Sequence, residues 1–207
     1  MKNYVTEFVG TLLFVFSIAL AVAHAGPFAP LAIGAALMCV VYMGGHISGG
    51  HYNPAVTLAV FLRGKIGGRD AGIYAVVQIL GAAVAAFLAS MVTSKAFVAA
   101  PSAETMPSLI VEVVFTFALC LVVLNVATDE KVEGNSFYGL AIGFTVVVGA
   151  YAGGSVSGGA YNPAVGIGPA LAAIGQAPID HIWLYAVGPL TGGALAAGVY
   201  KLQHPAD

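Results

Sequence analysis

The chain has 207 residues, of which 59% are hydrophobic and only 8% are charged, and its formal net charge is −2. Soluble domains carry about 25% charged residues, so this composition excludes a surface that faces water on all sides. Together with a mean hydropathy of +0.94, it predicts an integral membrane protein. The slightly negative charge provides no basic patch, which argues against a nucleic-acid partner.

Apolar runs bounded by charged residues or by Pro and Gly predict six membrane spans. Their approximate ranges in chain order are Tyr4–His24, Pro30–Gly49, Ala71–Ser94, Pro107–Thr128, Ser136–Tyr151 and Asp180–Tyr200. Six apolar spans of this kind are typical of an all-α membrane protein.

A thirteen-residue stretch occurs twice, around the ends of the second and fifth spans. Gly44–Val56 and Gly153–Val165 align at an offset of 109 and differ only at positions 46/155, 47/156 and 51/160. Both copies contain the same tripeptide: Asn53, Pro54 and Ala55 in the first, and Asn162, Pro163 and Ala164 in the second. An Asn side chain caps free backbone N–H groups and Pro fits the first helical position, so each tripeptide predicts the start of a helix.

The apolar segments that follow the two Asn-Pro pairs, Ala55–Leu62 and Ala164–Ala173, are short. A helix needs roughly 20 apolar residues to cross a bilayer. We therefore expect two re-entrant half-helices rather than two further spans.

The chain also divides into two internal repeats, at about 1–94 and 107–201, each with three spans and one half-helix. Because three is odd, the second repeat must enter the membrane from the opposite side. The expected fold is therefore six transmembrane helices plus two re-entrant half-helices, related as an inverted internal repeat within one domain over residues 1–207. The half-helices then enter from opposite faces and meet near the middle of the membrane.

The loop charges predict the orientation of the chain in the membrane. Only Lys95 falls on one side of the six spans. The other side holds six of the seven Lys and Arg residues, namely Lys2, Arg63, Lys65, Arg69, Lys131 and Lys201. By the positive-inside rule, both termini are expected in the cytoplasm.

Two acids, Glu7 and Glu112, lie near the beginnings of repeat-related spans. Non-helical backbone inside a membrane must find its hydrogen-bond partners within the protein. We therefore expect both carboxylates to accept hydrogen bonds from backbone N–H groups of the re-entrant loops. The alternative is that they handle protons or ions, since an acid inside a membrane is often functional.

Two helix N-termini that face each other would make a positive region in a medium of low dielectric constant. Each N-terminus carries roughly +0.5 of an elementary charge and unpaired N–H groups. A cation or hydronium ion meets an electrostatic barrier there, whereas a neutral solute does not. With Asn53 and Asn162 as donors and loop carbonyls as acceptors, this lining favours passage of small neutral molecules that form hydrogen bonds.

With these residues the sequence resembles the aquaporin and aquaglyceroporin family over essentially the whole chain. The resemblance rests on the two Asn-Pro-Ala motifs, the stretch from Gly45 to His51, and the acids Glu7 and Glu112. It implies one transmembrane channel domain per chain, assembly as a homotetramer, and passive flow without a cofactor. It also implies that His51 faces the pore, and the alternative for His51 is a polar anchor of the loop.

The sequence departs from the family at one position that bears on selectivity. The family usually has Arg three residues after the second motif Asn, where this chain has Val165. By the same resemblance the selectivity filter consists of Ile33, Ala150, Gly159 and Val165. This filter has no ring and no charge, and Val at this position resembles the vacuolar-type plant members. A wider, more apolar filter is therefore expected.

The resulting hypothesis is a passive channel for water and small uncharged solutes such as ammonia, hydrogen peroxide, urea or glycerol. The alternatives are a water-only channel, a secondary transporter, for which the spans offer few ionisable residues, and a structural membrane protein. No catalytic residue set or metal-ligand spacing is present, so neither an enzyme nor a cofactor is expected. The short chain favours a prokaryotic inner membrane.

Overall fold

A computed structural model describes residues 1–176 and 180–205. Within these residues the chain forms eight α-helices and two single-turn 3-10 helices. In chain order they are α1 (Lys2–His24), η1 (Gly26–Phe28), α2 (Ala29–Ser48), α3 (Pro54–Leu62), α4 (Gly68–Thr93), α5 (Thr105–Ala127), η2 (Glu130–Val132), α6 (Tyr138–Ser157), α7 (Pro163–Ala172) and α8 (Ile182–Gln203). Residues 177–179 and 206–207, which fall within the predicted domain, lie outside the described part of the chain.

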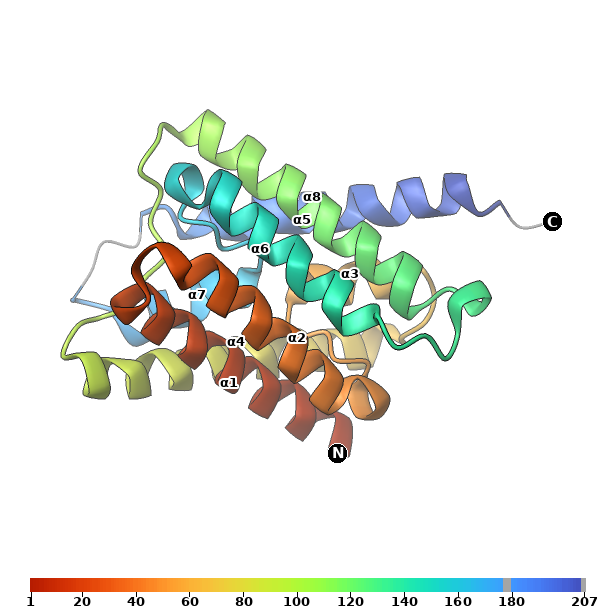
Figure 1. Cartoon of the computed structure of the whole chain (residues 1–207), viewed down its shortest axis with the longest axis horizontal. Coiled ribbons are helices and arrows are strands. Elements are labelled where there is room, and N and C mark those ends of the chain that lie inside the picture. Colours follow the sequence, from red (N-terminus) through yellow and green to blue (C-terminus); the bar gives the residue numbers. More distant parts are fainter. Residues whose placement is uncertain (177–179, 206–207) are drawn as a thin grey trace.

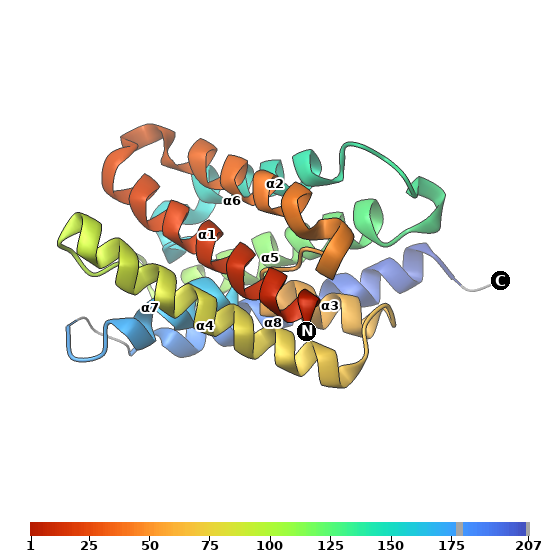
Figure 2. The same cartoon turned by 90° about the horizontal axis from the view of Figure 1, so that it is seen from below.

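The six long helices form one bundle around the two short helices. They run along the long axis of the molecule, and α1 begins at the same end of the bundle at which α8 ends (Figure 1). The short helices α3 and α7 lie toward opposite ends of the bundle in both views (Figures 1 and 2). The predicted all-α fold, with six membrane-length helices and two half-helices, is therefore confirmed.

The fifth span is longer than predicted, since α6 continues to Ser157 rather than ending near Tyr151. Gly153 and Gly154, which lie beyond the predicted end of this span, are both helical. The helix ends at Gly158, whose φ of 85° lies in the left-handed region and whose N–H bonds the carbonyl of Gly154. The first glycine pair behaves in the same way, so α2 also ends only where a left-handed residue is reached, at Gly49.

Helices α2 and α6 cross at a pair of glycines, Gly34 and Gly143. A Cβ added to Gly143 would lie 2.5 Å from the carbonyl oxygen of Gly34, and one added to Gly34 would lie 2.5 Å from the carbonyl oxygen of Gly143. The two backbones are therefore in direct contact. Lipid tails are as apolar as the helix surface, so the hydrophobic effect does not drive membrane helices together. They associate instead through close packing at small residues such as these.

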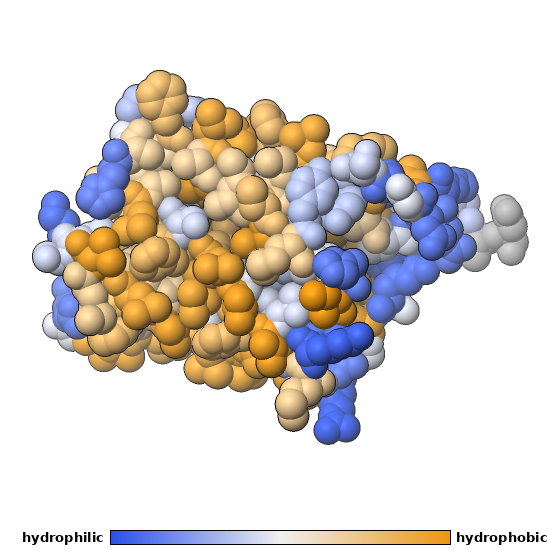
Figure 3. Space-filling view, turned by 60° about the horizontal axis from the view of Figure 1, so that its bottom comes forward, coloured by the Kyte–Doolittle hydropathy of each residue, from blue (hydrophilic) through white to orange (hydrophobic). Residues whose placement is uncertain are grey.

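The outer surface of the bundle is apolar over its middle. The face seen in Figure 3 has a broad hydrophobic belt, with hydrophilic residues gathered toward the two ends. Large side chains that remain exposed on the long helices include Val22, Val76, Phe87, Ile110 and Phe144. Such a belt on a soluble protein would be an aggregation site, and it is the surface that a lipid bilayer covers.

The helix crossing predicts that Gly143→Ala destabilises the fold by about 1–3 kcal/mol, because the new methyl group forces α2 and α6 apart. Gly198→Ala is the matched control, since a Cβ at this helical position meets no atom within 4 Å. Thermal unfolding in detergent, followed by the loss of monodisperse protein, measures both variants. Equal melting temperatures for the two variants would contradict the expected cost of separating α2 and α6.

Candidate functional site

Each Asn-Pro-Ala motif begins a short helix in the way that the sequence predicts. Asn53 and Asn162 have extended backbones, and their side-chain oxygens accept hydrogen bonds from the backbone N–H groups of Ala55 and Ala164, at 2.8 and 2.9 Å. Pro54 and Pro163 occupy the first position of α3 and α7. Both helix starts are therefore capped and need no water.

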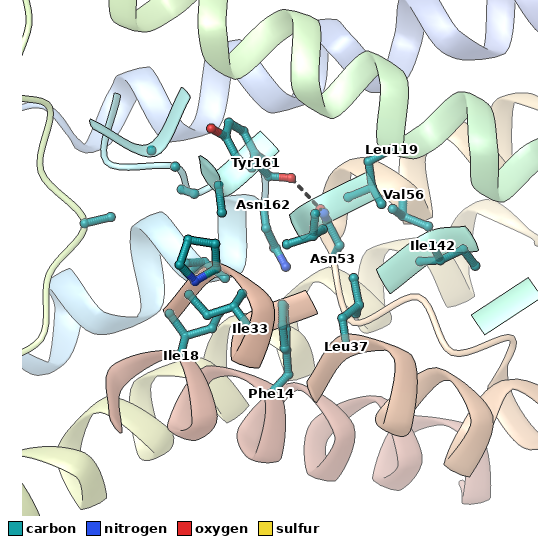
Figure 4. Close-up of a pocket in the computed structure, with 18 of the residues that line it drawn as sticks. Phe14, Ile18, Ile33, Leu37, Asn53, Val56, Leu119, Ile142, Tyr161 and Asn162 are labelled. Carbon is teal, nitrogen blue, oxygen red and sulfur yellow. Dashed lines mark hydrogen bonds between the residues drawn. The ribbon is translucent and has the colours of Figure 1, made fainter. Parts of the chain in front are cut away.

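The two motifs are also bonded to each other. The side-chain NH2 of Asn53 donates to the carbonyl of Tyr161 at 2.9 Å, drawn as a dashed line in Figure 4. In the reciprocal contact, the NH2 of Asn162 donates to the carbonyl of Tyr52 at 2.9 Å. These two bonds hold the N-termini of α3 and α7 face to face. Each amide keeps one further N–H for a molecule in the cavity that both Asn residues line.

The residue before each Asn has an unusual backbone conformation. Tyr52 and Tyr161 have φ of 49° and 48°, in the left-handed region that residues other than glycine rarely adopt. Such a conformation costs roughly 1–3 kcal/mol unless the surroundings fix it. Here the rings are buried, and their hydroxyl groups donate to the carbonyls of Val40 and Gly149, at 3.0 and 2.8 Å. The tyrosines therefore anchor the re-entrant loops in the bundle.

Glu7 and Glu112 are completely buried, and each accepts hydrogen bonds from one re-entrant loop. Glu7 accepts from the Ser48 hydroxyl at 2.6 Å and from the N–H groups of His51 and Tyr52, at 3.0 and 2.7 Å. The contacts of Glu112 are with the Ser157 hydroxyl and the N–H groups of Ala160 and Tyr161, at 2.7, 3.0 and 2.7 Å. Each carboxylate thus satisfies two backbone donors that have no helical partner.

A cavity of about 270 Å³ lies beside the paired motifs. It is lined by Asn53, Asn162 and His51, and by the four expected filter residues Ile33, Ala150, Gly159 and Val165. Apolar side chains form much of the remaining wall, among them Phe14, Ile18, Leu37 and Leu119 (Figure 4). A water molecule occupies about 30 Å³ in the liquid, so the cavity has room for several waters in a largely apolar passage.

A second, wider cavity of about 1060 Å³ leads from this passage to the end of the bundle where the termini lie. The two cavities share the residues Val41, Gly50, His51, Val123 and Ile142. The first cavity reaches the opposite end, where Val22 and Pro30 line it. The two cavities therefore meet at these five residues, and together they extend through the bundle from one end to the other.

Charged residues surround the wide mouth of the second cavity. Lys65 and Glu130 form an ion pair at 3.1 Å between the α3–α4 and α5–α6 connections. Asp129 accepts from the backbone N–H of Lys131 at 2.9 Å and from the Tyr200 hydroxyl at 3.1 Å, and pairs with His204 at 3.0 Å. The Lys131 N–H, helped by these partners, holds the pKa of Asp129 below its usual range.

Several lining and supporting residues were not found from the sequence, and three of them bear on the site. Phe97 and Ala99 belong to the connection between the repeats, yet both line the narrow cavity. No repeat or motif marks them, so only the folded chain reveals them. Gln78 is fully buried in α4 and donates to Glu7 at 2.8 Å. The sequence marks it as the single side-chain amide within its apolar span, and this feature could have identified it.

The loop contacts predict that Glu112→Gln lowers stability by about 1–3 kcal/mol, because an amide nitrogen faces donors that need an acceptor. Water permeability should fall in the same variant, since the loop carries Asn162. Thermal unfolding in detergent and vesicle shrinkage measure the two effects. Glu133→Gln, at an exposed position, is the control. A Glu112→Gln protein as stable and permeable as the control would contradict the scaffold role.

Comparison with solved structures supports the fold. The aquaglyceroporin from Plasmodium falciparum superposes with a TM-score of 0.85 at 23% sequence identity, covering 99% of this chain and 97% of that one. At this identity the likeness concerns the arrangement of helices alone. It includes six long helices and two half-helices in one inverted repeat.

Sequence comparison identifies the family. Aquaporin NIP1-1 of Zea mays is 38% identical over 173 residues, and Aquaporin NIP1-4 of Oryza sativa is 38% identical over 182 residues. These matches cover 82% and 85% of this chain, which spans only 60% and 64% of the two relatives' lengths. Glycerol uptake facilitator protein-like 6 of Lactiplantibacillus plantarum is 37% identical over 219 residues, with 100% of both chains covered. The profile of the Major intrinsic protein family matches residues 1–200, and the chain belongs to that family.

Proposed function

We propose that the chain forms a passive channel for water and small uncharged solutes. The observation that carries this proposal is the passage through the bundle, made of two cavities that share five residues, with two Asn caps beside its narrow part. Membership of the Major intrinsic protein family and the names of the aquaporin relatives support the same function.

The paired helix starts supply the proposed means of excluding charge. The N-termini of α3 and α7 meet at the narrow cavity, and each contributes roughly +0.5 of an elementary charge. Because apolar side chains form much of the wall, little water is present to screen this charge. A cation therefore meets a barrier, while a neutral molecule can accept hydrogen bonds from Asn53 and Asn162 as it passes.

The proposed selectivity filter is the set Ile33, Ala150, Gly159 and Val165. All four lie on the wall of one cavity, and Val165 is buried with only 3% of its surface exposed. The set provides neither a positive charge nor a ring to reject solutes larger than water. Ammonia, hydrogen peroxide, urea and glycerol are the proposed solutes, and glycerol is supported by the name of the relative from Lactiplantibacillus plantarum.

A water-only channel is the second candidate, and Phe97 is the observation that favours it. This side chain lines the narrow cavity together with the filter residues and adds the ring that the filter itself lacks. If the Phe97 ring crosses the passage, the cavity is narrower than Val165 implies.

The orientation and assembly of the chain complete the proposal. The first residues of α1 and the last residues of α8 lie at the same end of the bundle as Lys65 and Lys131. Lys95 follows the C-terminal end of α4, at the other end of the bundle. By the positive-inside rule, both termini are proposed to be cytoplasmic, in a prokaryotic inner membrane. The family resemblance supports a homotetramer, which mass measurement of the detergent-solubilised protein tests.

The function is tested by stopped-flow light scattering from proteoliposomes, with empty liposomes as the control. Sucrose should cause shrinkage faster than in the control. Glycerol or urea should cause shrinkage followed by fast re-swelling, because the solute enters after water leaves. Shrinkage without re-swelling identifies the water-only channel, and control-like shrinkage contradicts both.

The solute range is tested by a pair of substitutions in the same assay. Val165→Arg should reduce urea and glycerol permeability by at least about ten-fold, equivalent to ~1.4 kcal/mol of added barrier, and should retain water flow. Phe97→Ala should raise glycerol permeability, because a ring is removed from the wall. Unchanged solute uptake in Val165→Arg would contradict the filter assignment.

A further inference from the structure

A chain of buried polar side chains connects Glu7 to the passage. The side-chain nitrogen of Gln78 donates to Glu7 Oε2 at 2.8 Å and to Thr57 Oγ1 at 3.1 Å. Thr57 Oγ1 lies 3.0 Å from Nδ1 of His51, which lines both cavities. Gln78 and Thr57 are 0% and 2% exposed, so both side chains take their hydrogen-bond partners from within the bundle.

The Glu7 carboxylate, at one end of this series of polar side chains, decides which group donates in each contact. Glu7 has four hydrogen-bond donors around it, two at each carboxylate oxygen, and Gln78 is one of the four. This is the pattern of an ionised carboxylate, which only accepts hydrogen bonds. The nitrogen of the Gln78 amide must therefore face Glu7. Its oxygen is buried without a partner among the described residues, which is a cost of this orientation, but the reverse orientation would place the amide oxygen against the carboxylate.

The amide in turn decides the direction of the remaining bond. Both N–H groups of the Gln78 amide are engaged, one with Glu7 and one with Thr57. Thr57 Oγ1 thus accepts from Gln78, and within the described chain its own proton has only Nδ1 of His51 as an acceptor. An accepting Nδ1 carries no proton, so the neutral imidazole carries its proton on Nε2.

Nε2 of His51 is available to a permeating molecule. Among the described residues it has no hydrogen-bond partner, and the ring lies where the two cavities meet. The other residues shared by both cavities are Val41, Gly50, Val123 and Ile142, whose side chains offer no hydrogen bond. Among the five shared residues, His51 is therefore the one whose side chain can donate a hydrogen bond where the two cavities meet.

The second repeat shows that the polar chain is not needed to hold a re-entrant loop. At the positions related to His51, Thr57 and Gln78 by offsets of 109 and 111, it has Ala160, Gly166 and Pro189. Its loop is nevertheless held by Glu112, which accepts from the Ser157 hydroxyl and two backbone N–H groups, and by the Tyr185 hydroxyl, which donates to the Ser157 carbonyl. The three polar residues are thus an addition that only the first repeat carries.

We propose that Gln78 and Thr57 are positioning residues that fix His51 in the Nε2–H form, so that it presents a permanent donor at the junction of the two cavities. The donor binds the oxygen of water, or of a solute such as urea or glycerol, where the wall is otherwise apolar. This role rests on the proposed channel function. The His51 donor makes the junction of the two cavities a second point at which solutes are selected, separate from the proposed selectivity filter.

Thr57→Val tests the proposal, because it keeps the shape of the side chain and removes the hydroxyl. The tautomer of His51 is read from ¹⁵N NMR spectra of histidine-labelled protein in lipid bilayers, with its signal identified by its absence in His51→Gln. The ratio of Nε2–H to Nδ1–H forms should fall by about three- to ten-fold, the effect of one lost hydrogen bond. Water permeability in proteoliposomes should fall in proportion to the loss of the Nε2–H fraction.

Two further variants separate positioning from a general effect on folding. Thr57→Ser keeps the hydroxyl and should retain both the tautomer and the water permeability. Thr116→Val removes a hydroxyl that is equally buried but has no partner, and it should leave both unchanged. If Thr57→Val does not fold, Gln78→Met supplies the same comparison, since it removes the amide that directs the Thr57 proton.

An unchanged tautomer in Thr57→Val or Gln78→Met would overturn the proposal. A changed tautomer with unchanged permeability would overturn the role in permeation. A wild-type protein that does not conduct water contradicts the channel function instead, and the NMR comparison still decides whether Thr57 and Gln78 position the ring.

Discussion

The constraint on which the rest of the structure depends is the need to satisfy backbone N–H groups inside a membrane. Two loops enter the bundle without helical hydrogen bonds, and each unpaired group there costs several kcal/mol. Glu7 and Glu112 remove this cost by accepting from two consecutive N–H groups of each loop. Both acids can be buried because every group that contacts their carboxylates donates a hydrogen bond to them. An acid is tolerated in an apolar interior only under this condition.

Once the loops are held, their own geometry places the helix starts. Tyr52 and Tyr161 turn the chain with a left-handed residue, and the following Asn caps the helix and bonds the opposite loop. The caps therefore join the two repeats at their centre, where two positive helix ends would otherwise repel each other. Each amide bonds a carbonyl of the other repeat and so offsets part of that repulsion.

The sequence predicts those parts of the molecule that are encoded locally. The caps, the half-helices and the six spans follow from Asn-Pro, Gly and apolar runs, because such signals act over a few residues. The end of α6 was predicted about six residues too early, because Gly153 lies inside the helix and serves close packing rather than a turn: a Cβ at Gly153 would lie 2.5 Å from Val111. Phe97 was missed because its place beside the filter depends on how a connection without repeat symmetry folds back.

The two repeats share a scaffold, and their differences lie along the passage. Glu, Ser, Tyr and Asn make matching contacts in both, so these residues hold the loops whatever the passage conducts. His51 in the first repeat corresponds to Ala160 in the second. Val165 corresponds to Val56, so this position is the same in both repeats, and both valines line the narrow cavity. One repeat thus brings an imidazole to the passage where the other brings only a methyl group. Because the scaffold is satisfied by its own contacts, substitutions at these positions can change what passes without removing any bond that the fold requires.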